Sequence, residues 1–192
     1  LASPEAFERD PGFVWQWYDA RRGDVAAVAP NAGHTALARL EARVADFILV
    51  TQNVDGLHQA AGSENVHELH GSLWRLRCTA CGGEGPDQRV PLPELPPRCS
   101  DCGGLLRPAV VWFGEMLPGA VLDAAAAACR RADTVLVAGT SAVVEPAASL
   151  PLVGKENGAR LIEVNPEATP LSGEADVSLR GTSAGVLPTL IP

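Results

Sequence analysis

Hydrophobic positions near the start of the chain recur at helical spacing. The aromatic residues at 13, 15, 17 and 18 are three or four apart in pairs, and the apolar residues at 37, 40 and 44 continue this spacing. Asn31 follows a proline and is the residue type that favours a helix N-cap, so a helix should begin there. The pattern predicts a helical segment over residues 1–45.

Three short apolar runs occupy residues 47–50, 134–138 and 160–164. The first two lack the alternation of a half-exposed strand and are typical of strands buried on both faces. Helical patterns at 123–131 and 146–153 lie before and between the last two runs. Strands that alternate with helices predict a parallel α/β sheet of Rossmann-like type.

A segment rich in Gly, Pro and Cys interrupts this alternation between about residues 73 and 106. We interpret it as a small zinc-binding module inserted into the α/β domain. The predicted organisation is a helical segment at 1–45, a Rossmann-like part at 46–72 and 107–192, and an insert at 73–106.

Two Cys-x-x-Cys pairs inside the insert predict a metal site. The ligands are Cys78 and Cys81, then Cys99 and Cys102, with 17 residues between the pairs. Four thiolates complete a tetrahedral zinc shell, which leaves no open position for chemistry, so one structural Zn²⁺ is expected. The alternatives are disulfides, which need an oxidising compartment, or idle thiols. Cys129 lies in an Ala-rich helical run and is interpreted as a small buried hydrophobe.

Composition narrows the classes of function. Hydrophobic residues make up 46% of the 192 positions, which is typical of a globular protein. A net charge of −8 argues against general binding to nucleic acid or to a membrane surface, and no apolar run is long enough to span a membrane. Arginine outnumbers lysine 14 to 1, a bias that indicates a bacterial source. Without a recognisable secretory signal, we expect a cytoplasmic protein.

Polar residues follow each of the three predicted strands. Ligands of open parallel sheets bind outside the carboxyl ends of the strands, so we expect these clusters at one edge, around a ligand with ribose hydroxyls and phosphates. Gly139 would let such a ligand approach the backbone, and Thr140 and Ser141 offer hydroxyls to phosphate. The clusters are residues 51–55, 139–141 and 165–167.

Histidine is scarce, and His70 is the notable one because it precedes Gly71 at the entry to the insert. An imidazole at such a junction can act as a general base near neutral pH. The alternative is a hydrogen-bonded core histidine. His34 falls inside a predicted helix and is interpreted as structural.

Several motifs follow one another along the chain: TQNVDGLHQAAG, HELHGS, the two Cys pairs, VVWFGE, GTS and the stretch from Asn165. In this order they resemble the sirtuins, which are NAD-dependent protein deacylases. The resemblance covers the chain from about Ala2 to its end. It implies that His70 is the general base that accepts a proton from the NAD ribose, while nicotinamide leaves and the acyl oxygen attacks C1′. The implied products are O-acyl-ADP-ribose and free lysine.

The resemblance also implies roles for the remaining motif residues. Val111 to Glu115, with Trp112 and Phe113, match a strand that pairs with the backbone of the substrate peptide, as in other edge-addition modes. The other matches concern NAD. They are Gln52, Asn53, Val54 and Asp55 for nicotinamide and its ribose; Gly139, Thr140 and Ser141 for the diphosphate and ribose; and Asn165, Pro166, Glu167 and Ser183 for adenosine.

Tyr18 and Arg21, three residues apart on a predicted helix, resemble the signature of class III sirtuins, which remove succinyl, malonyl and glutaryl groups. A tyrosine hydroxyl and an arginine fork can hold a carboxylate through charge-assisted hydrogen bonds. Ala6 matches a small residue that widens the acyl pocket of this class, and Phe113 fits its WFGE segment. We therefore expect acidic acyl groups, with acetyl as the alternative.

Sirtuins normally begin with a strand and a Gly-Ala-Gly loop that cradles the NAD diphosphate, and this sequence has no such segment. We expect an N-terminally truncated chain that binds NAD weakly, so its activity stays open. Two other functions remain: a zinc-ribbon module that binds nucleic acid or protein, and an inactive relative that only binds NAD or ADP-ribose.

Overall fold

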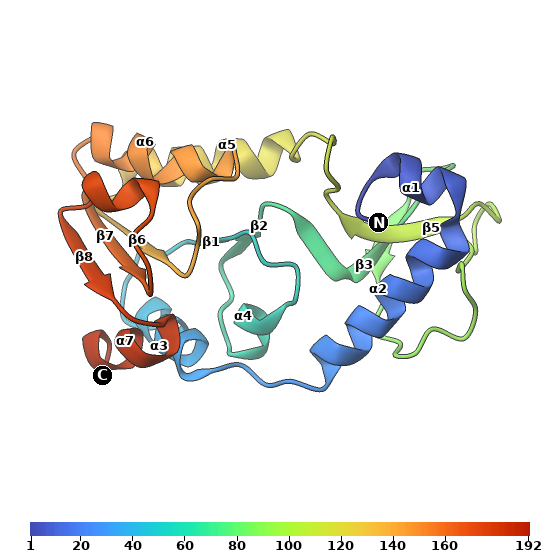
Figure 1. The fold of residues 1–192 in the computed structure, drawn as a ribbon, viewed down its shortest axis with the longest axis horizontal. Helices are drawn as coiled ribbons and strands as arrows, with labels where there is room; N and C mark the ends of the chain where they lie inside the picture. Colours follow the sequence, from blue (N-terminus) through green and yellow to red (C-terminus); the bar gives the residue numbers. More distant parts are fainter. The chain divides into compact units, whose positions relative to one another are not determined.

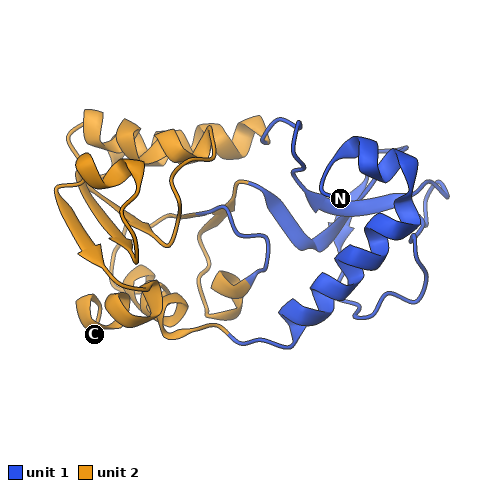
Figure 2. Cartoon of the chain, viewed as in Figure 1, with its two compact units in different colours: residues 1–29, 51–56, 70–117 blue, residues 30–50, 57–69, 118–192 orange.

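The computed structural model describes all residues from 1 to 192 and divides them into two compact units (Figure 2). Unit 1 consists of Leu1–Ala29, Thr51–Gly56 and His70–Leu117, and unit 2 of Pro30–Val50, Leu57–Leu69 and Pro118–Pro192. This division differs from the predicted domains, because the first helices belong with the cysteine-rich module while the helix after Asn31 belongs to unit 2.

Two helices open unit 1, α1 (Pro4–Arg9) and α2 (Pro11–Ala26). Each begins with a proline after a capping side chain, and the caps satisfy backbone N–H groups that have no partner within the helix. The predicted helical spacing in α2 separates a buried face with Trp15 and Tyr18 from an outer face with Phe13 and Trp17, which are 55% and 39% exposed.

The cysteine-rich module of unit 1 is an antiparallel sheet in the order β4–β3–β5. Its strands are β3 (Gly71–Cys78), β4 (Glu84–Pro86) and β5 (Leu106–Val110). Helix α2 packs on this sheet through a core that contains Trp15, Leu73, Leu76 and Trp112. The indole N–H of Trp15 donates to the Leu106 carbonyl at 2.7 Å, so α2 is joined to β5 by a hydrogen bond as well as by apolar packing.

Unit 2 contains the predicted parallel sheet, in the order β6–β7–β8. Helices α5 and α6 cover one face of the sheet and α3 and α7 the other (Figure 1). The sheet and its helices comprise α3 (Ala32–Glu41), α5 (Gly119–Arg131), β6 (Thr134–Ala138), η1 (Ala147–Ser149), α6 (Leu150–Glu156), β7 (Arg160–Asn165), η2 (Pro170–Gly173), β8 (Val177–Arg180) and α7 (Ser183–Leu190).

Side chains of β6 alternate between the two layers, as expected for a strand packed on both faces. Leu136 and Ala138 pack with α3 and α7, whereas Val135 and Val137 join the cluster on the other face. Helix α3 begins after Asn31, whose side chain accepts hydrogen bonds from the Gly33 and His34 N–H groups. The predictions of this N-cap and of a structural His34 are therefore confirmed, since the His34 ring completes the capping box.

The first predicted strand does not join the parallel sheet. It forms β1 (Leu49–Thr51), which pairs with β2 (Val66–Glu68), and the short helix α4 (Leu57–Ala60) lies between them in the sequence. The Leu49 N–H donates to the Asn65 carbonyl at 3.0 Å. The prediction that three strands share one sheet edge was wrong for β1, because its hydrogen bonds go to a strand formed close by in the sequence.

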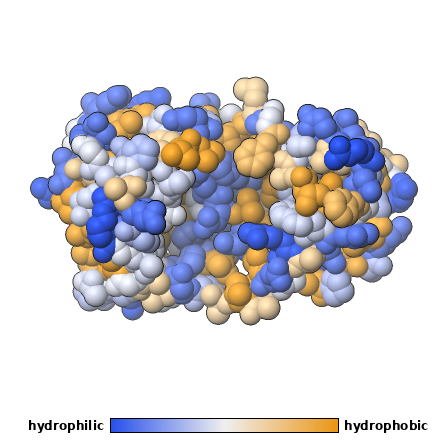
Figure 3. Space-filling model, viewed as in Figure 1, coloured by the Kyte–Doolittle hydropathy of each residue, from blue (hydrophilic) through white to orange (hydrophobic).

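No helix is both long enough and apolar enough to cross a lipid bilayer. On the face drawn in Figure 3, hydrophobic residues are interspersed among hydrophilic ones. Among the exposed large hydrophobic residues are Phe113 and Met116, which follow β5 and are 80% and 92% exposed.

Candidate functional site

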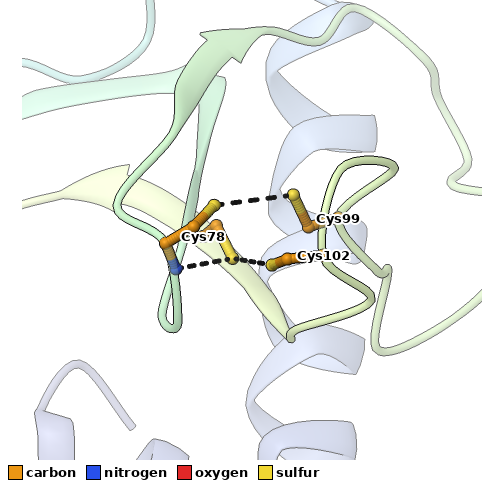
Figure 4. Close-up of side chains that lie close together, drawn as sticks. Cys78, Cys99 and Cys102 are labelled. Carbon is orange, nitrogen blue, oxygen red and sulfur yellow. Dashed lines mark hydrogen bonds between the residues drawn. The ribbon is translucent and has the colours of Figure 1, made fainter.

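The four predicted cysteine ligands gather at one end of the β3–β5 sheet. Cys78 ends β3 and Cys81 lies in the following turn, while Cys99 and Cys102 come from a second turn that faces the first (Figure 4). Their ligand sulfurs all lie within 4.8 Å of one another, with Cys78 Sγ 3.5 Å from Cys102 Sγ and Cys81 Sγ 3.9 Å from Cys99 Sγ. Tetrahedral zinc with Zn–S bonds of about 2.3 Å needs sulfurs about 3.8 Å apart, so the cluster fits one Zn²⁺.

The two turns hold their shape through the backbone. The Cys78 N–H donates to the Gly83 carbonyl and the Cys99 N–H to the Gly104 carbonyl, each at 2.8 Å. Glycines at φ 73° and 72°, Gly82 and Gly103, make these reversals possible. Hydrogen bonds from the N–H groups of Cys81 and Ala80 lower the pKa of Cys78, whereas the neighbouring cysteines raise that of Cys102, as expected for thiols that crowd together and compete for one proton. The cysteines form no disulfide, and the predicted zinc site matches the donor set.

His70 lies directly before β3, in unit 1 with the Gln52–Asp55 loop. Its Nδ1 is 3.1 Å from the backbone carbonyl oxygen of Gln52. A carbonyl oxygen can only accept, so this contact places the proton on Nδ1 and leaves Nε2 with a free lone pair. The His70 carbonyl in turn accepts from the Val111 N–H at 2.9 Å. The Nδ1 contact fixes the orientation of the ring and the nitrogen that faces Gln52.

The Gln52–Asp55 loop is bound to β3 along its length. The Leu73 N–H donates to the Val54 carbonyl at 2.9 Å, and the indole N–H of Trp74 donates to the Asp55 carbonyl at 2.6 Å. At the start of the loop, the Asn53 N–H donates to the Thr51 hydroxyl. These contacts hold Val54 and Asp55 beside β3, and the Gln52 carbonyl meets His70, so the predicted nicotinamide residues and the predicted base lie together in unit 1.

Tyr18 is buried and receives a hydrogen bond from Trp112. The indole Nε1 of Trp112 lies 2.7 Å from the Tyr18 hydroxyl oxygen. Burial raises the pKa of Tyr18, so the phenol keeps its proton. Arg21, one turn along α2, is exposed, and its guanidinium carbon lies 6.0 Å from the centre of the Trp17 ring. Ala6 is buried in the core cluster that contains Tyr18 and Trp112.

Arg107 lies over the ring of Trp112. The guanidinium carbon of Arg107 lies 3.3 Å from the centre of the indole ring, and its nitrogens pair with both carboxylate oxygens of Glu115. The second Glu115 oxygen also accepts from the Trp112 N–H at 2.8 Å. Although burial acts to raise it, the pKa of Glu115 is lowered overall by these hydrogen bonds. Arg107 therefore lies over the face of the Trp112 ring, while Tyr18 accepts a hydrogen bond at the ring's N–H edge.

Residues 111–115 do not form the predicted strand. The N–H groups of Val111, Trp112 and Phe113 donate to the His70 carbonyl, the Glu115 carboxylate and the Ala2 carbonyl. The segment closes in a tight turn in which the Glu115 N–H donates to the Trp112 carbonyl. The prediction of a strand here was wrong, because the Arg107–Glu115 pair and these internal bonds turn the chain after β5.

In unit 2, two of the three predicted polar clusters follow neighbouring strands. Ala138 of β6 pairs with Val164 of β7, so Gly139 and Asn165 leave the sheet at the same edge. Gly139 has φ 65°, and a Cβ atom there would lie 3.1 Å from the Ser183 hydroxyl at the start of α7. The Thr140 hydroxyl accepts from the Ala142 N–H, which fixes the turn that follows.

The second cluster at this edge is the turn at Asn165–Glu167. The Asn165 side chain donates to the Glu167 carbonyl at 2.9 Å, and the Asn165 carbonyl accepts from the Gly181 N–H at 3.3 Å. Hydroxyls, a carboxamide and the N-terminus of a helix are the groups that bind ribose and diphosphate oxygens. The chemistry of these residues therefore fits the ADP part of NAD.

Comparison with known proteins decides the lineage. Residues 1–146 match the Sir2 family. The chain belongs to the Sir2 family. The NAD-dependent protein deacylase of Aquifex aeolicus (strain VF5) is 55% identical over 180 residues, which are 94% of this chain and 75% of that protein.

Solved structures of Sir2 proteins share the fold of this sirtuin chain. A Sir2 homolog–NAD complex superposes with a TM-score of 0.95 at 52% identity and covers 99% of this chain and 74% of that one. A Sir2 protein bound to acetylated peptide gives a TM-score of 0.89 at 31% identity, covering 97% and 79%. The prediction of the sirtuin family is confirmed, and so is an α/β fold with a four-cysteine module.

Several residues that support the site were not predicted from the sequence. Arg107 and Glu163 are charged residues inside apolar strands, and both are buried. Arg22 of α2 is also buried and donates to the Asp87 carboxylate and to the carbonyls of Asp87 and Arg89. A charge within an apolar run is a usable signal, because a buried charge requires partners.

Proposed function

We propose that this sirtuin is an NAD-dependent protein-lysine deacylase. The observation that carries the proposal is the contact of His70 Nδ1 with the Gln52 carbonyl, which leaves Nε2 able to accept a proton. A general base needs such a free lone pair and a fixed direction. A hydrogen-bonded core histidine would make the same contact, so the activity of a His70→Ala protein separates the two roles.

NAD supplies an activated ribose carbon, C1′, from which nicotinamide leaves as the acyl oxygen attacks. We assign His70 Nε2 to accept the proton of a ribose hydroxyl. Gln52, Asn53, Val54 and Asp55, held on β3, bind the nicotinamide and its ribose in this proposal. We also assign Gly139, Thr140 and Ser141 to the diphosphate and ribose, and Asn165, Pro166, Glu167 and Ser183 to adenosine.

We also propose a preference for acidic acyl groups, with Tyr18 and Arg21 as the carboxylate ligands. Trp112 donates to the Tyr18 oxygen, so the phenolic O–H must itself find an acceptor. A carboxylate is such an acceptor, and a methyl group is not. Arg21 lies one helical turn away and carries the complementary charge. Ala6 leaves room for the longer acyl chain, and Val111, Trp112 and the exposed Phe113 bind the peptide around the lysine.

Deacetylation is the second candidate, and the position of Arg21 favours it. The Arg21 guanidinium lies over Trp17, where it is already engaged in a cation–π contact at 6.0 Å. If that contact persists with substrate and holds the guanidinium away from the Tyr18 hydroxyl, the two groups do not bind one carboxylate together, and acetyl would be accepted equally. For the place of action we propose the cytoplasm, because four free thiolates at a zinc site need a reducing compartment.

A competition assay tests both parts of the proposal. Succinyl-lysine and acetyl-lysine peptides of the same sequence are mixed with NAD and the protein, and their loss is followed by mass spectrometry. We expect NAD-dependent loss of succinyl ahead of acetyl. His70→Ala should abolish both reactions, and His67→Ala, a half-buried histidine outside the site, should preserve both.

Tyr18→Phe separates the acyl preference from the deacylase activity. The substitution removes the hydroxyl and keeps the ring in the core, so we expect the succinyl reaction to fall while the acetyl reaction persists. Equal loss of both peptides by the unsubstituted protein would establish the deacetylase alternative. A His70→Ala protein with full activity would refute the role of the base.

A further inference from the structure

Glu163 is a buried charge at the centre of unit 2. Glu163 lies on β7 and is 1% exposed, and four donors converge on its carboxylate. The Ser172 and Ser178 hydroxyls lie 2.6 Å from Oε2 and the Arg180 Nη1 lies 2.9 Å from it, while the Thr169 hydroxyl donates to Oε1. A buried carboxylate is stable only with such a full set of partners. These partners come from η2 and β8, so the carboxylate holds both elements against β7.

Arg180 connects this carboxylate to the turn at the end of β7. The same Nη1 that binds Glu163 also donates to the Glu167 carbonyl at 3.1 Å. The Glu167 carbonyl accepts a second hydrogen bond from the Asn165 side chain at 2.9 Å. One carbonyl thus receives a donor from each side of the turn. Arg180 fixes the conformation of Asn165–Glu167, and Glu163 fixes the position of the Arg180 guanidinium.

We propose that the Glu163–Arg180 pair positions the Asn165–Glu167 turn for the adenosine ribose of NAD. The inference rests on the proposed function, which assigns that turn to adenosine. In this scheme Arg180 is a positioning residue that acts through the Glu167 carbonyl. Its side chain is 41% exposed, and three hydroxyls also bind the carboxylate, so we expect unit 2 to stay folded, at lower stability, when the guanidinium is removed.

Arg180→Met is the variant that tests the proposal, because it keeps the alkyl stem and removes the guanidinium, with its bonds to Glu163 and Glu167 and its Nη2 bonds to the Ser172 and Ser178 hydroxyls. ADP-ribose binding is measured by calorimetry, and steady-state kinetics give the KM for NAD, the KM for the acyl peptide and kcat. We expect the Kd for ADP-ribose and the KM for NAD to rise about tenfold, the effect of one lost charge-assisted hydrogen bond. The KM for the peptide and kcat at saturating NAD should stay within about twofold, because in this scheme the turn contacts neither the peptide nor the reacting atoms.

Two further variants keep the test decisive. Arg160→Met removes an exposed arginine from the start of β7, at the end away from the Asn165–Glu167 turn, and should leave every constant unchanged. Arg180→Lys retains the charge beside Glu163, and we expect it to recover most of the lost affinity. If Arg180→Met lowers the melting temperature, the same constants are measured for Arg180→Lys instead.

The outcomes distinguish this inference from the proposed function. The inference alone is overturned if the wild type is active and the Kd of Arg180→Met for ADP-ribose is within about twofold of the wild-type Kd. A parallel rise in the KM values for NAD and for peptide would also overturn it, since that pattern reports general loosening. A wild type that shows neither ADP-ribose binding nor deacylation would remove the proposed function and the inference with it.

Discussion

Gly71, the residue after His70, allows a sharp prediction about stability. Its φ is 75°, and a Cβ atom built on it would lie 2.0 Å from the backbone oxygen of Ala109 on the neighbouring strand. The contact is with backbone rather than with a flexible side chain, so Gly71→Ala must push β3 and β5 apart. Gly71 pairs with Val110 at this point, and the His70 carbonyl accepts from the Val111 N–H at 2.9 Å.

The magnitude follows from two contributions. A left-handed backbone conformation costs a non-glycine residue about 1–2 kcal/mol. Separating the strands by roughly 1 Å weakens one or two backbone hydrogen bonds, each contributing about 0.5–1.5 kcal/mol. We expect Gly71→Ala to lower the free energy of unfolding by about 2–5 kcal/mol, which a domain of ordinary stability can survive. The shift should also disturb the contact of His70 with Gln52 and reduce kcat/KM.

Gly82→Ala is the matched control. Gly82 has φ 73° in the same unit, and a Cβ atom there meets no atom within 4 Å. It should therefore show the conformational cost alone, about 1–2 kcal/mol. Urea unfolding of both variants measures the difference. If Gly71→Ala were no less stable than Gly82→Ala, the argument from the Ala109 contact would be refuted.

Three further predictions concern the metal, pH and the core. Chelation under reducing conditions should release one zinc per chain and unfold the β3–β4–β5 module. Cys99→Ala should have the same effect, whereas Cys129→Ala should keep the metal. A module that stays folded without metal would contradict the zinc assignment. The pKa of Glu163 is lowered to about 2, so its stabilisation is complete above about pH 4.5 and is lost as the pH falls toward 2. Over that range wild type should lose about 3 kcal/mol more than Glu163→Gln in urea titrations, and equal slopes would argue against the buried charge. Trp15→Phe should destabilise the protein by about 1–3 kcal/mol, since it leaves the Leu106 carbonyl without its donor, and an unchanged unfolding midpoint would show that water replaces the indole.

Much of the fold could be predicted because its signals are local. The spacing of Cys78, Cys81, Cys99 and Cys102 is enough to predict a four-sulfur site, since two tight turns need only a few residues each. The apolar runs of β6 and β7 and the cap at Asn31 are equally local. In each case the residues that define the structure lie within a few positions of one another.

The errors involve the choice of partner, which the pattern of apolar and polar residues does not specify. An apolar run predicts that β1 is a strand, but not that it pairs with β2. The sequence of Val111–Glu115 suits a strand, and the Arg107–Glu115 pair turns it instead. Glu163 illustrates a missed signal, because its partners lie 6 to 17 residues away and only the incongruity of a carboxylate in an apolar strand points to them.

The interleaving of the two units has a consequence for how the chain folds as it is synthesised. Tyr18 and Trp112, which bond within the core of unit 1, are separated by 94 residues, and Trp15 and Leu106 by 91. The buried face of α2 therefore emerges from the ribosome long before its partner strand exists, and contacts this distant in sequence form slowly. Until residue 112 is made, the apolar side of the first two helices is open to chaperones and to aggregation, so expression should depend on translation rate more than on the stability of the finished protein.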